Sequence, residues 1–176
     1  MKEDFVILVD EKDKKIGLKE KVAAHLGEDS LHRAFMFFIF DDRGRLFLQK
    51  RSKDKMLWPL YWDTGASHPR VKEDYESAGM RRLKEELGFS CQLENIGKFQ
   101  YKSRYKNIGS ENEICAVLAG RYNGVVNPNP GEIAEWKWIE IKSLKKEITK
   151  NPQHYTPWLK IGLKVFLKER KGRFLK

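Results

Sequence analysis

The sequence contains very little cysteine. Cys91 and Cys115 are its two cysteines, and neither belongs to a CxxC pair. Two isolated cysteines do not make the disulfide framework of a small secreted protein, and a reducing compartment suits them best. We therefore expect a cytoplasmic location.

Long apolar segments, internal repeats and low-complexity linkers are also missing. No run approaches the roughly 20 apolar residues that cross a bilayer, so we expect no membrane insertion. The chain begins MKEDFVILV, a charged start followed by strand-forming side chains, which is not the pattern of a secretory signal. A length of 176 residues without a linker predicts one domain, residues 1–176. Nothing in the sequence indicates the oligomeric state.

Negative charge is in the minority. The 35 Lys and Arg residues outnumber 25 Asp and Glu, which gives a net charge of +10. This balance favours anionic partners, and nucleic acid, acidic lipid and phosphorylated metabolites all qualify. Part of the excess lies between Lys160 and Lys176, where Leu159, Leu163 and Leu167 recur at the spacing of a core-facing helical stripe. We interpret this basic tail as a solvated amphipathic helix rather than a nucleic-acid surface.

Apolar runs rich in Val, Ile, Leu and Phe predict strands near residues 5–9, 34–40 and 45–49. Apolar residues then recur at helical spacing from 73 to 87, and Gly88 ends this helix. Further strands are predicted at 95–104, 111–121 and 134–140, and helices near 141–149 and 155–169. This order predicts an α/β or α+β sandwich with the sheet in the middle.

The predicted helix that ends at Gly88 carries adjacent carboxylates. Its segment RRLKEELGF at 81–89, with Glu73 eight residues before the first arginine, resembles the Nudix box. Neighbouring carboxylates on a helix can hold Mg²⁺, which in turn bridges the oxygens of a diphosphate. The alternative is that Glu85 and Glu86 only form surface ion pairs with the arginines four residues before them.

Two positions depart from the general Nudix box. Ser67 stands where the pattern has its first glycine, and Arg82 stands where it has a glutamate. One carboxylate that Nudix hydrolases use for metal is therefore missing. This departure argues against ordinary Nudix hydrolysis.

Three histidines and a carboxylate pair occur in short motifs. The histidines end VAAH and lie within LHRAF and SHP, and the pair is Glu-Asn-Glu on a predicted strand, where positions i and i+2 point to the same face. These motifs resemble the type I isopentenyl diphosphate isomerases of the Nudix superfamily, over nearly the whole chain. The matching residues are His25, His32, His68, Glu111 and Glu113. Three imidazoles and two carboxylates suit a divalent transition metal, Mn²⁺, Zn²⁺ or Fe²⁺, better than Ca²⁺.

The resemblance implies a Nudix-type α/β/α sandwich with a central mixed sheet, and a role for each matching residue. Basic side chains that grip a diphosphate match Lys21, Arg51, Lys55 and Arg82. The isomerases carry arginine at the last of these positions, so the departure from the general box fits the narrower family. Glu86 matches the carboxylate for the Mg²⁺ that accompanies the diphosphate.

The same resemblance implies a proton-transfer group and an aromatic wall. Glu113 matches a carboxylate that contacts the first metal and moves a proton, and Tyr101 matches a tyrosine that helps this transfer. Trp158 matches an aromatic residue over the hydrocarbon end of the substrate. An aromatic face suits that place because the reaction passes through a tertiary cation.

The second proton-transfer group of the family is absent. In the isomerases it is a cysteine two residues before the histidine matched by His68, and this sequence has Ala66 there. The segment from Trp62 to His68 is also one residue shorter than in the family. Ser67 or Thr64 is expected to approach the substrate instead, although a hydroxyl is a poorer acid and base than a thiol.

Three functions remain open on the sequence. The first is an isomerase of isopentenyl diphosphate that uses an altered proton route. The second is a metal-dependent hydrolase of another diphosphate or a nucleotide, and the third is a protein that binds a diphosphate without turning it over. The favoured partner is a small diphosphate, and nucleic-acid binding through the basic surface stays open only for the third function.

Overall fold

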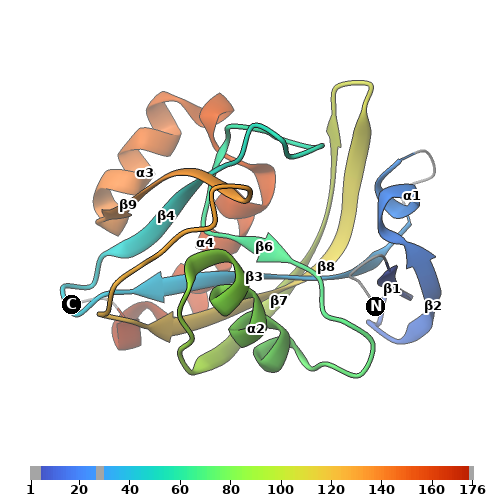
Figure 1. The fold of residues 1–176 in the computed structure, drawn as a ribbon, viewed down its shortest axis with the longest axis horizontal. Helices are drawn as coiled ribbons and strands as arrows, with labels where there is room; N and C mark the ends of the chain where they lie inside the picture. Colours follow the sequence, from blue (N-terminus) through green and yellow to red (C-terminus); the bar gives the residue numbers. More distant parts are fainter. Residues whose placement is uncertain (1–4, 27–29, 175–176) are drawn as a thin grey trace.

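A mixed sheet forms the middle layer of the protein (Figure 1). The structure is a computed structural model that describes residues 5–26 and 30–174. The strands of the sheet are β1 Phe5–Val9, β2 Lys15–Glu20, β3 His32–Phe40, β4 Leu46–Arg51, β5 Trp62–Asp63, β6 Ala66–Ser67, β7 Leu93–Tyr105, β8 Gly109–Arg121 and β9 Ile133–Ile139. The helical elements are α1 Lys21–His25, α2 Tyr75–Leu87, α3 Ile141–Lys150, the short 3₁₀ helix η1 Pro152–His154 and α4 Pro157–Phe174.

Strand β3 is the centre of the fold. It pairs in parallel with β8 along its whole length and is antiparallel to β1, β4 and β6. Its side chains alternate between two cores, as expected for a strand covered on both faces. Met36 and Phe38 belong to the core beneath α4, whereas Phe35 and Phe37 belong to the core beneath α2. The arrangement confirms the predicted α/β/α sandwich.

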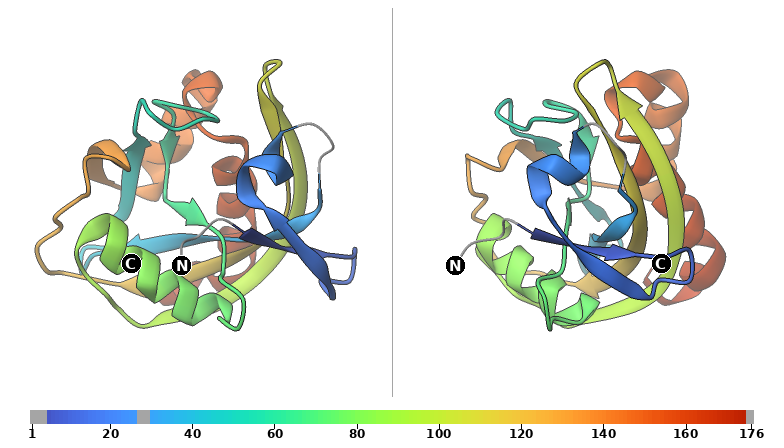
Figure 2. Two further views of the ribbon diagram at one scale, coloured as in Figure 1. Left: turned by 45° about the vertical axis from the view of Figure 1, so that its right-hand side comes forward. Right: turned by 90° about the vertical axis from the view of Figure 1, so that its right-hand side faces the viewer.

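Helix α2 covers one face of the sheet (Figures 1 and 2). It begins after Asp74, whose carboxylate accepts a hydrogen bond from Ser77 N at 2.7 Å, and it ends at Gly88 with φ 74°. Leu83 and Leu87 are fully buried against the sheet. The helix that carries the Nudix-box carboxylates is therefore anchored at both ends and along its apolar face.

Helix α4 covers the opposite face and extends past the predicted end at residue 169. Leu159, Leu163 and Phe166 are buried, and Phe166 stacks on Phe38 with ring centroids 5.2 Å apart. The predicted apolar stripe is confirmed. Lys176, the end of the predicted basic tail, lies outside the described residues. No helix among the described residues has the length and apolar character needed to span a membrane.

Five short elements were not predicted from the sequence: β2, α1, β5, β6 and η1. Strand β2 shows mostly exposed side chains and so lacks an apolar run, and β5 and β6 have two residues each. Such elements form through pairing with longer neighbours, which local propensity does not reveal. Of these, α1, β5 and β6 carry or flank residues of the site described below.

Three segments rise together at one end of the molecule: the β7–β8 hairpin, α1 and the loop between β4 and β5 (Figures 1 and 2). Gly109 lies at the hairpin tip, where an added Cβ would come within 2.5 Å of His25 O and 3.1 Å of a Leu57 methyl group. Contact this close requires glycine. Residues of all three segments line one pocket.

Candidate active site

Three histidines and two glutamates meet beside this pocket. One donor atom from each of His25, His32, His68, Glu111 and Glu113 lies within 4.8 Å of all the others. Nε2 of His68 is 3.0 Å from Glu113 Oε1, and Nε2 of His25 is 2.9 Å from Glu111 Oε2. The five side chains come from four separate parts of the chain, and their donor set suits a divalent metal ion.

Strand pairing explains how these residues meet. His32 lies opposite Glu113 in the parallel β3–β8 register, and Tyr101 lies opposite Glu113 in the antiparallel β7–β8 register. His68 directly follows β6, which pairs with β3 through Ser67 and Phe35. The sheet therefore fixes all of these positions except that of His25.

His25 is positioned by the short helix α1. Glu20 caps this helix, because its carboxylate oxygens accept hydrogen bonds from Val22 N at 2.9 Å and Ala23 N at 2.7 Å. The ring Nδ1 of His25 lies 2.5 Å from the carbonyl of Lys21, one turn earlier. This contact turns Nε2 toward Glu111.

The histidine tautomers fit a metal ion. Nδ1 of His25 faces the carbonyl of Lys21, and Nδ1 of His32 lies 2.7 Å from the carbonyl of Ser30. A carbonyl oxygen only accepts hydrogen bonds, so Nδ1 carries the proton in both rings. In the neutral rings Nε2 therefore carries a lone pair, and Nε2 of His32 lies 3.3 Å from Nε2 of His68. A lone pair on Nε2 of His25 and of His32, beside two carboxylates, suits a cation bound between them. Backbone carbonyls commonly fix the tautomer of metal-binding histidines in this way.

Burial and mutual contacts shift the pKa values of these groups. Burial lowers the pKa of His25, but Glu111 more than offsets it and raises the pKa to about 9. Burial also raises the pKa of Glu111, and the nearby charge of Glu113 raises it further. For Glu113, hydrogen bonds from His32 and His68 outweigh burial and hold its pKa well below the usual range. Of the two carboxyl groups, Glu113 therefore has the lower pKa.

A second charged cluster lies on α2. Arg82 donates from Nε to Glu86 Oε1 at 2.9 Å and from Nη1 to Glu85 Oε2 at 2.9 Å, and Nη2 lies 3.4 Å from Glu132 Oε1. Lys55 also pairs with Glu132. Glu86 is 3% exposed, and burial raises its pKa. The predicted ion pair between Arg82 and Glu86 therefore exists, but it is buried rather than on the surface.

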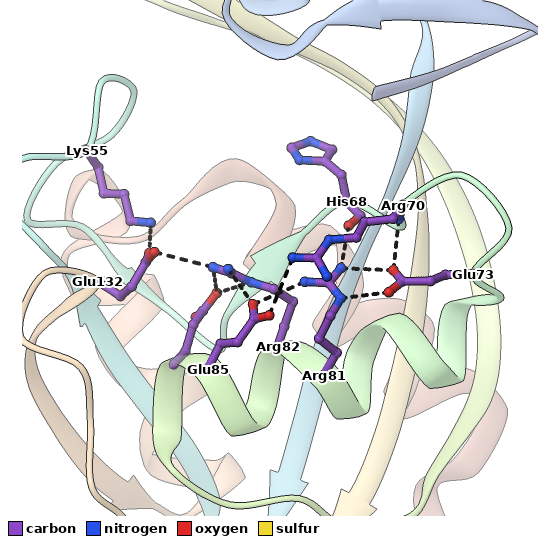
Figure 3. Close-up of polar contacts among 9 residues, drawn as sticks. Lys55, His68, Arg70, Glu73, Arg81, Arg82, Glu85 and Glu132 are labelled. Carbon is purple, nitrogen blue, oxygen red and sulfur yellow. Dashed lines mark hydrogen bonds and ion pairs between the residues drawn. The ribbon is translucent and has the colours of Figure 1, made fainter. Parts of the chain in front are cut away.

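Figure 3 shows that this cluster continues along the helix. Arg81 donates to both oxygens of Glu73, at 2.7 and 2.9 Å, and to Glu85 at 3.1 Å. Glu73 also accepts from the backbone N of Arg70 at 2.8 Å, and its pKa is lowered chiefly by Arg81. This end of the Nudix box thus ties the loop before α2 to the helix.

The pocket, of about 350 Å³, joins the two clusters. It is large enough for a small ligand. Most of the predicted site residues line it: Lys21, His25, Arg51, Lys55, Ser67, His68, Arg82, Tyr101, Glu111, Glu113 and Trp158. His32 is fully buried behind the other metal-ligand candidates, and Glu86 stands behind Arg82. Thr64 is buried and is not among the lining residues.

One side of the pocket is aromatic and apolar. Trp158 is 2% exposed, and its ring lies 6.1 Å from that of Tyr101 and 5.1 Å from that of Trp58. The Tyr101 hydroxyl donates to Glu113 Oε2 at 2.6 Å, and burial raises the pKa of this phenol well above its ordinary value. Tyr101 therefore links the aromatic wall to the metal-ligand group.

Ala66 and Ser67 form part of the pocket wall. The preceding Gly65 has φ 100°, and a Cβ there would clash with the ring of Phe37. This position therefore needs glycine, which holds the short segment before Ala66 in one path. The methyl group of Ala66 lies where the sequence resemblance places a cysteine.

The structure adds two carboxylates that were not predicted from the sequence. Glu132 follows the predicted turn at 127–131 and lines the pocket beside Lys55 and Arg82. Asp63 is fully buried and accepts a hydrogen bond from Trp158 Nε1 at 3.0 Å. Neither residue stands in a recognisable motif, so no local signal indicated them.

Comparison with known proteins identifies the family of the chain. The sequence matches the NUDIX domain over residues 30–159. It is 41% identical over 158 residues to isopentenyl-diphosphate Delta-isomerase 1 of Photorhabdus laumondii, covering 88% of this chain and 90% of that protein. Against isopentenyl-diphosphate Delta-isomerase 1 of Aromatoleum aromaticum the identity is 43% over 158 residues, with 89% of each chain covered.

Solved structures show the same fold at lower sequence identity. The crystal structure of DR0079 from Deinococcus radiodurans matches with a TM-score of 0.74 at 19% identity, over 92% of this chain and 99% of that one. A MutT protein from Methanosarcina mazei matches with a TM-score of 0.67 at 18% identity, over 82% and 99% of the two chains. The sandwich is therefore shared with proteins whose sequences have diverged widely.

Proposed function

Because the chain belongs to the isopentenyl-diphosphate isomerase family of the Nudix proteins, we propose that it converts isopentenyl diphosphate to dimethylallyl diphosphate. The conversion adds one proton to the alkene and removes another. One observation carries the proposal: a single pocket has basic groups at one side, and an aromatic wall beside a tyrosine–glutamate pair at the other. We also propose that residues 1–176 form one domain and that the protein is cytoplasmic.

The diphosphate fits the basic side of the pocket. Lys21, Lys55 and Arg82 offer cationic donors there, and Arg51 donates mainly to the carbonyls of Leu57 and Trp58, at 2.9 and 3.0 Å. In the protein alone, Lys55 and Arg82 are paired with carboxylates. A diphosphate would take over these cations, since charge-assisted contacts to phosphate are strong.

The same exchange makes room for Mg²⁺. Once Arg82 and Lys55 turn to the diphosphate, Glu86 and Glu132 are left as buried or half-buried carboxylates that need a new positive partner. Mg²⁺ prefers oxygen ligands and commonly bridges a carboxylate and phosphate oxygens. Glu86 is the ligand expected from the sequence, and Glu132 is the further candidate that the geometry supports.

A second divalent metal, Mn²⁺, Zn²⁺ or Fe²⁺, fits the three histidines and two glutamates. It would supply positive charge that keeps Glu113 ionised and fixed in orientation. Glu113 and Tyr101 then exchange a proton with the alkene, because their oxygens are 2.6 Å apart and both residues line the pocket. Trp158 offers its ring to the tertiary cation that forms.

The opposite proton transfer has to follow an altered route. Ala66 cannot exchange a proton, and Ser67 beside it is the neighbouring hydroxyl that lines the pocket. We assign the second transfer to Ser67, acting directly or through a water molecule. A hydroxyl in this role predicts slower turnover than a thiol would give.

Hydrolysis of another diphosphate or a nucleotide is the second candidate. The methyl group of Ala66 favours it, because losing one proton-transfer group harms isomerisation and leaves a metal-assisted attack by water unaffected. Arg82 argues against hydrolysis, because this arginine occupies the position of a metal-binding glutamate in the general Nudix box. Binding without turnover is the third candidate, but both Glu111 and Glu113 are present.

Proton NMR of the purified protein with Mg²⁺, Mn²⁺ and isopentenyl diphosphate in heavy water separates these functions. Dimethylallyl diphosphate that carries deuterium is the expected product. Release of phosphate would instead establish hydrolysis. An unchanged substrate that binds measurably would leave binding without turnover as the function.

A further inference from the structure

Asp63 is a buried carboxylate beside the aromatic wall, separate from both charged clusters. Its Oδ1 accepts from Thr64 N at 2.7 Å and faces Thr156 Oγ1 at 3.4 Å, and its Oδ2 accepts from Trp158 Nε1 at 3.0 Å. Nη1 of Arg51 lies 3.7 Å from Oδ2. Asp63 is 0% exposed, so its hydrogen-bond donors are shielded from solvent at this carboxylate.

The neighbours of Asp63 favour its charged form. Burial raises the pKa of Asp63 above its ordinary value, and the Arg51 guanidinium and the three hydrogen-bond donors offset only part of this shift. Both oxygens act as acceptors, which is what an ionised carboxylate requires. An anion in this position is one member of a buried pair with Arg51, so removing either charge leaves the other uncompensated.

The charge of Asp63 bears directly on Trp158. The Arg51 guanidinium lies 5.2 Å from the centre of the Trp158 ring, at a distance typical of a cation–π contact. A cation beside an aromatic ring repels a second cation nearby, which weakens the ability of the ring to stabilise positive charge in the pocket. Asp63 counteracts this repulsion, because its carboxylate lies beside Arg51 and binds the indole N–H at the edge of the same ring.

The segment around Asp63 also fixes the place of the ring. The carbonyl of the preceding residue, Trp62, accepts a hydrogen bond from Thr156 N at 3.1 Å. Asp63 lies opposite Gln49 in the β4–β5 pairing. The carboxylate thus connects the sheet to the start of α4, where Trp158 stands.

We propose that Asp63 is a positioning residue that allows Trp158 to favour a positively charged hydrocarbon end over a neutral one. It does so by holding the indole N–H and by balancing the charge of Arg51. The inference rests on the proposed function, since a tertiary cation at the ring is part of that reaction. It assigns to Asp63 an effect on charge preference that a purely structural residue does not have.

A matched pair of probes tests this effect without turnover. In 2-(dimethylamino)ethyl diphosphate a protonated amine stands in for the tertiary cation, and 3-methylbutyl diphosphate has the same shape without the charge. Calorimetric titration of each into the Mg²⁺-loaded and Mn²⁺-loaded protein gives a ratio of affinities. We expect the wild-type protein to prefer the cationic probe by roughly tenfold, as a desolvated cation–π contact provides.

Asp63→Asn keeps the shape of the side chain and removes its charge. We expect the preference for the cationic probe to fall at least about fivefold, while affinity for the neutral probe stays within about twofold of wild type. Asp42→Asn, in the turn after β3 and exposed, serves as the control and should keep the preference. An unchanged preference in Asp63→Asn would overturn the inference and leave the proposed function intact.

The wild-type protein itself provides the second arm. If it shows no preference for the cationic probe, the cation of the proposed function fails, and the role of Asp63 fails with it. If Asp63→Asn does not fold, NMR of the wild-type protein provides the test instead. The indole N–H resonance of Trp158 is assigned by its absence from the spectrum of Trp158→Phe. This resonance should shift on binding of the cationic probe and stay nearly fixed with the neutral one, and equal shifts would overturn the inference.

Discussion

The hydroxyl of Tyr101 donates a hydrogen bond to Glu113 Oε2 across 2.6 Å, from directly opposite positions on the paired strands β7 and β8. Tyr101→Phe removes this donor and keeps the buried ring. If the pair moves a proton in the reaction, we expect isomerase activity to fall roughly hundredfold with the metal content unchanged. Tyr155→Phe is the matched control. The Tyr155 hydroxyl donates to Glu147 across 2.7 Å, and neither residue lines the pocket. Equal activity of the two variants would remove Tyr101 from the reaction.

Loss of a histidine ligand should empty the metal site. Replacing His25, His32 or His68 with alanine removes one of five donors from a group whose members lie within 4.8 Å of each other. Elemental analysis of the purified variants should show loss of the transition metal, and His154→Ala, at an exposed position outside the group, should retain it. Wild-type metal content in all three variants would show that these residues do not form a metal site.

Glu86→Gln tests the magnesium position. Glutamine has the size of glutamate and can still accept from Arg82, but it lacks the charge that Mg²⁺ requires. We expect Mg²⁺-dependent affinity for isopentenyl diphosphate to fall at least about tenfold by calorimetry, with the transition metal retained. Glu76→Gln, in the first turn of the same helix, is the control. Equal affinity in wild type and Glu86→Gln would exclude Glu86 as the ligand.

Ala66→Cys restores a thiol at the pocket wall. A thiol is the better proton-transfer group near neutral pH, so we expect isomerase activity to rise by roughly a hundredfold. Ala66→Ser separates chemistry from packing, since it adds a group of similar size and should give little gain. The NMR assay in heavy water measures both. No gain in Ala66→Cys would mean that the short segment fixed by Gly65 no longer presents position 66 to the substrate.

The sequence predicted the long elements well because their apolar side chains follow simple periods. The apolar run at 34–40 and the stripe of Leu159 and Leu163 are visible in the sequence, and the structure buries both. Strands β5 and β6 could not be predicted, because two residues form a strand only when β4 and β3 are already beside them. Their existence depends on tertiary contacts that local propensity does not encode.

The sequence predicted the candidate metal ligands but missed two carboxylates elsewhere in the site. The metal-ligand candidates were found through a family resemblance, and the structure brings all five together. Glu132 and Asp63 were missed, since each acquires its importance from a cation brought close by folding: Lys55 for Glu132, and Arg51 for Asp63. Such pairs join segments far apart in the chain and leave no pattern in one sequence.

The parallel pairing of β3 with β8 sets an order on the assembly of the site. His32 and Glu113 are neighbours in that pairing although residues 33–112 lie between them. During synthesis from the N-terminus, all three histidines are made before either carboxylate of the group exists, and Trp158 follows later still. A nascent chain therefore passes through a stage with imidazoles and no carboxylates. The set of candidate ligands is complete only when β8 closes against β3, so a metal that binds to all five would load after the sheet is finished.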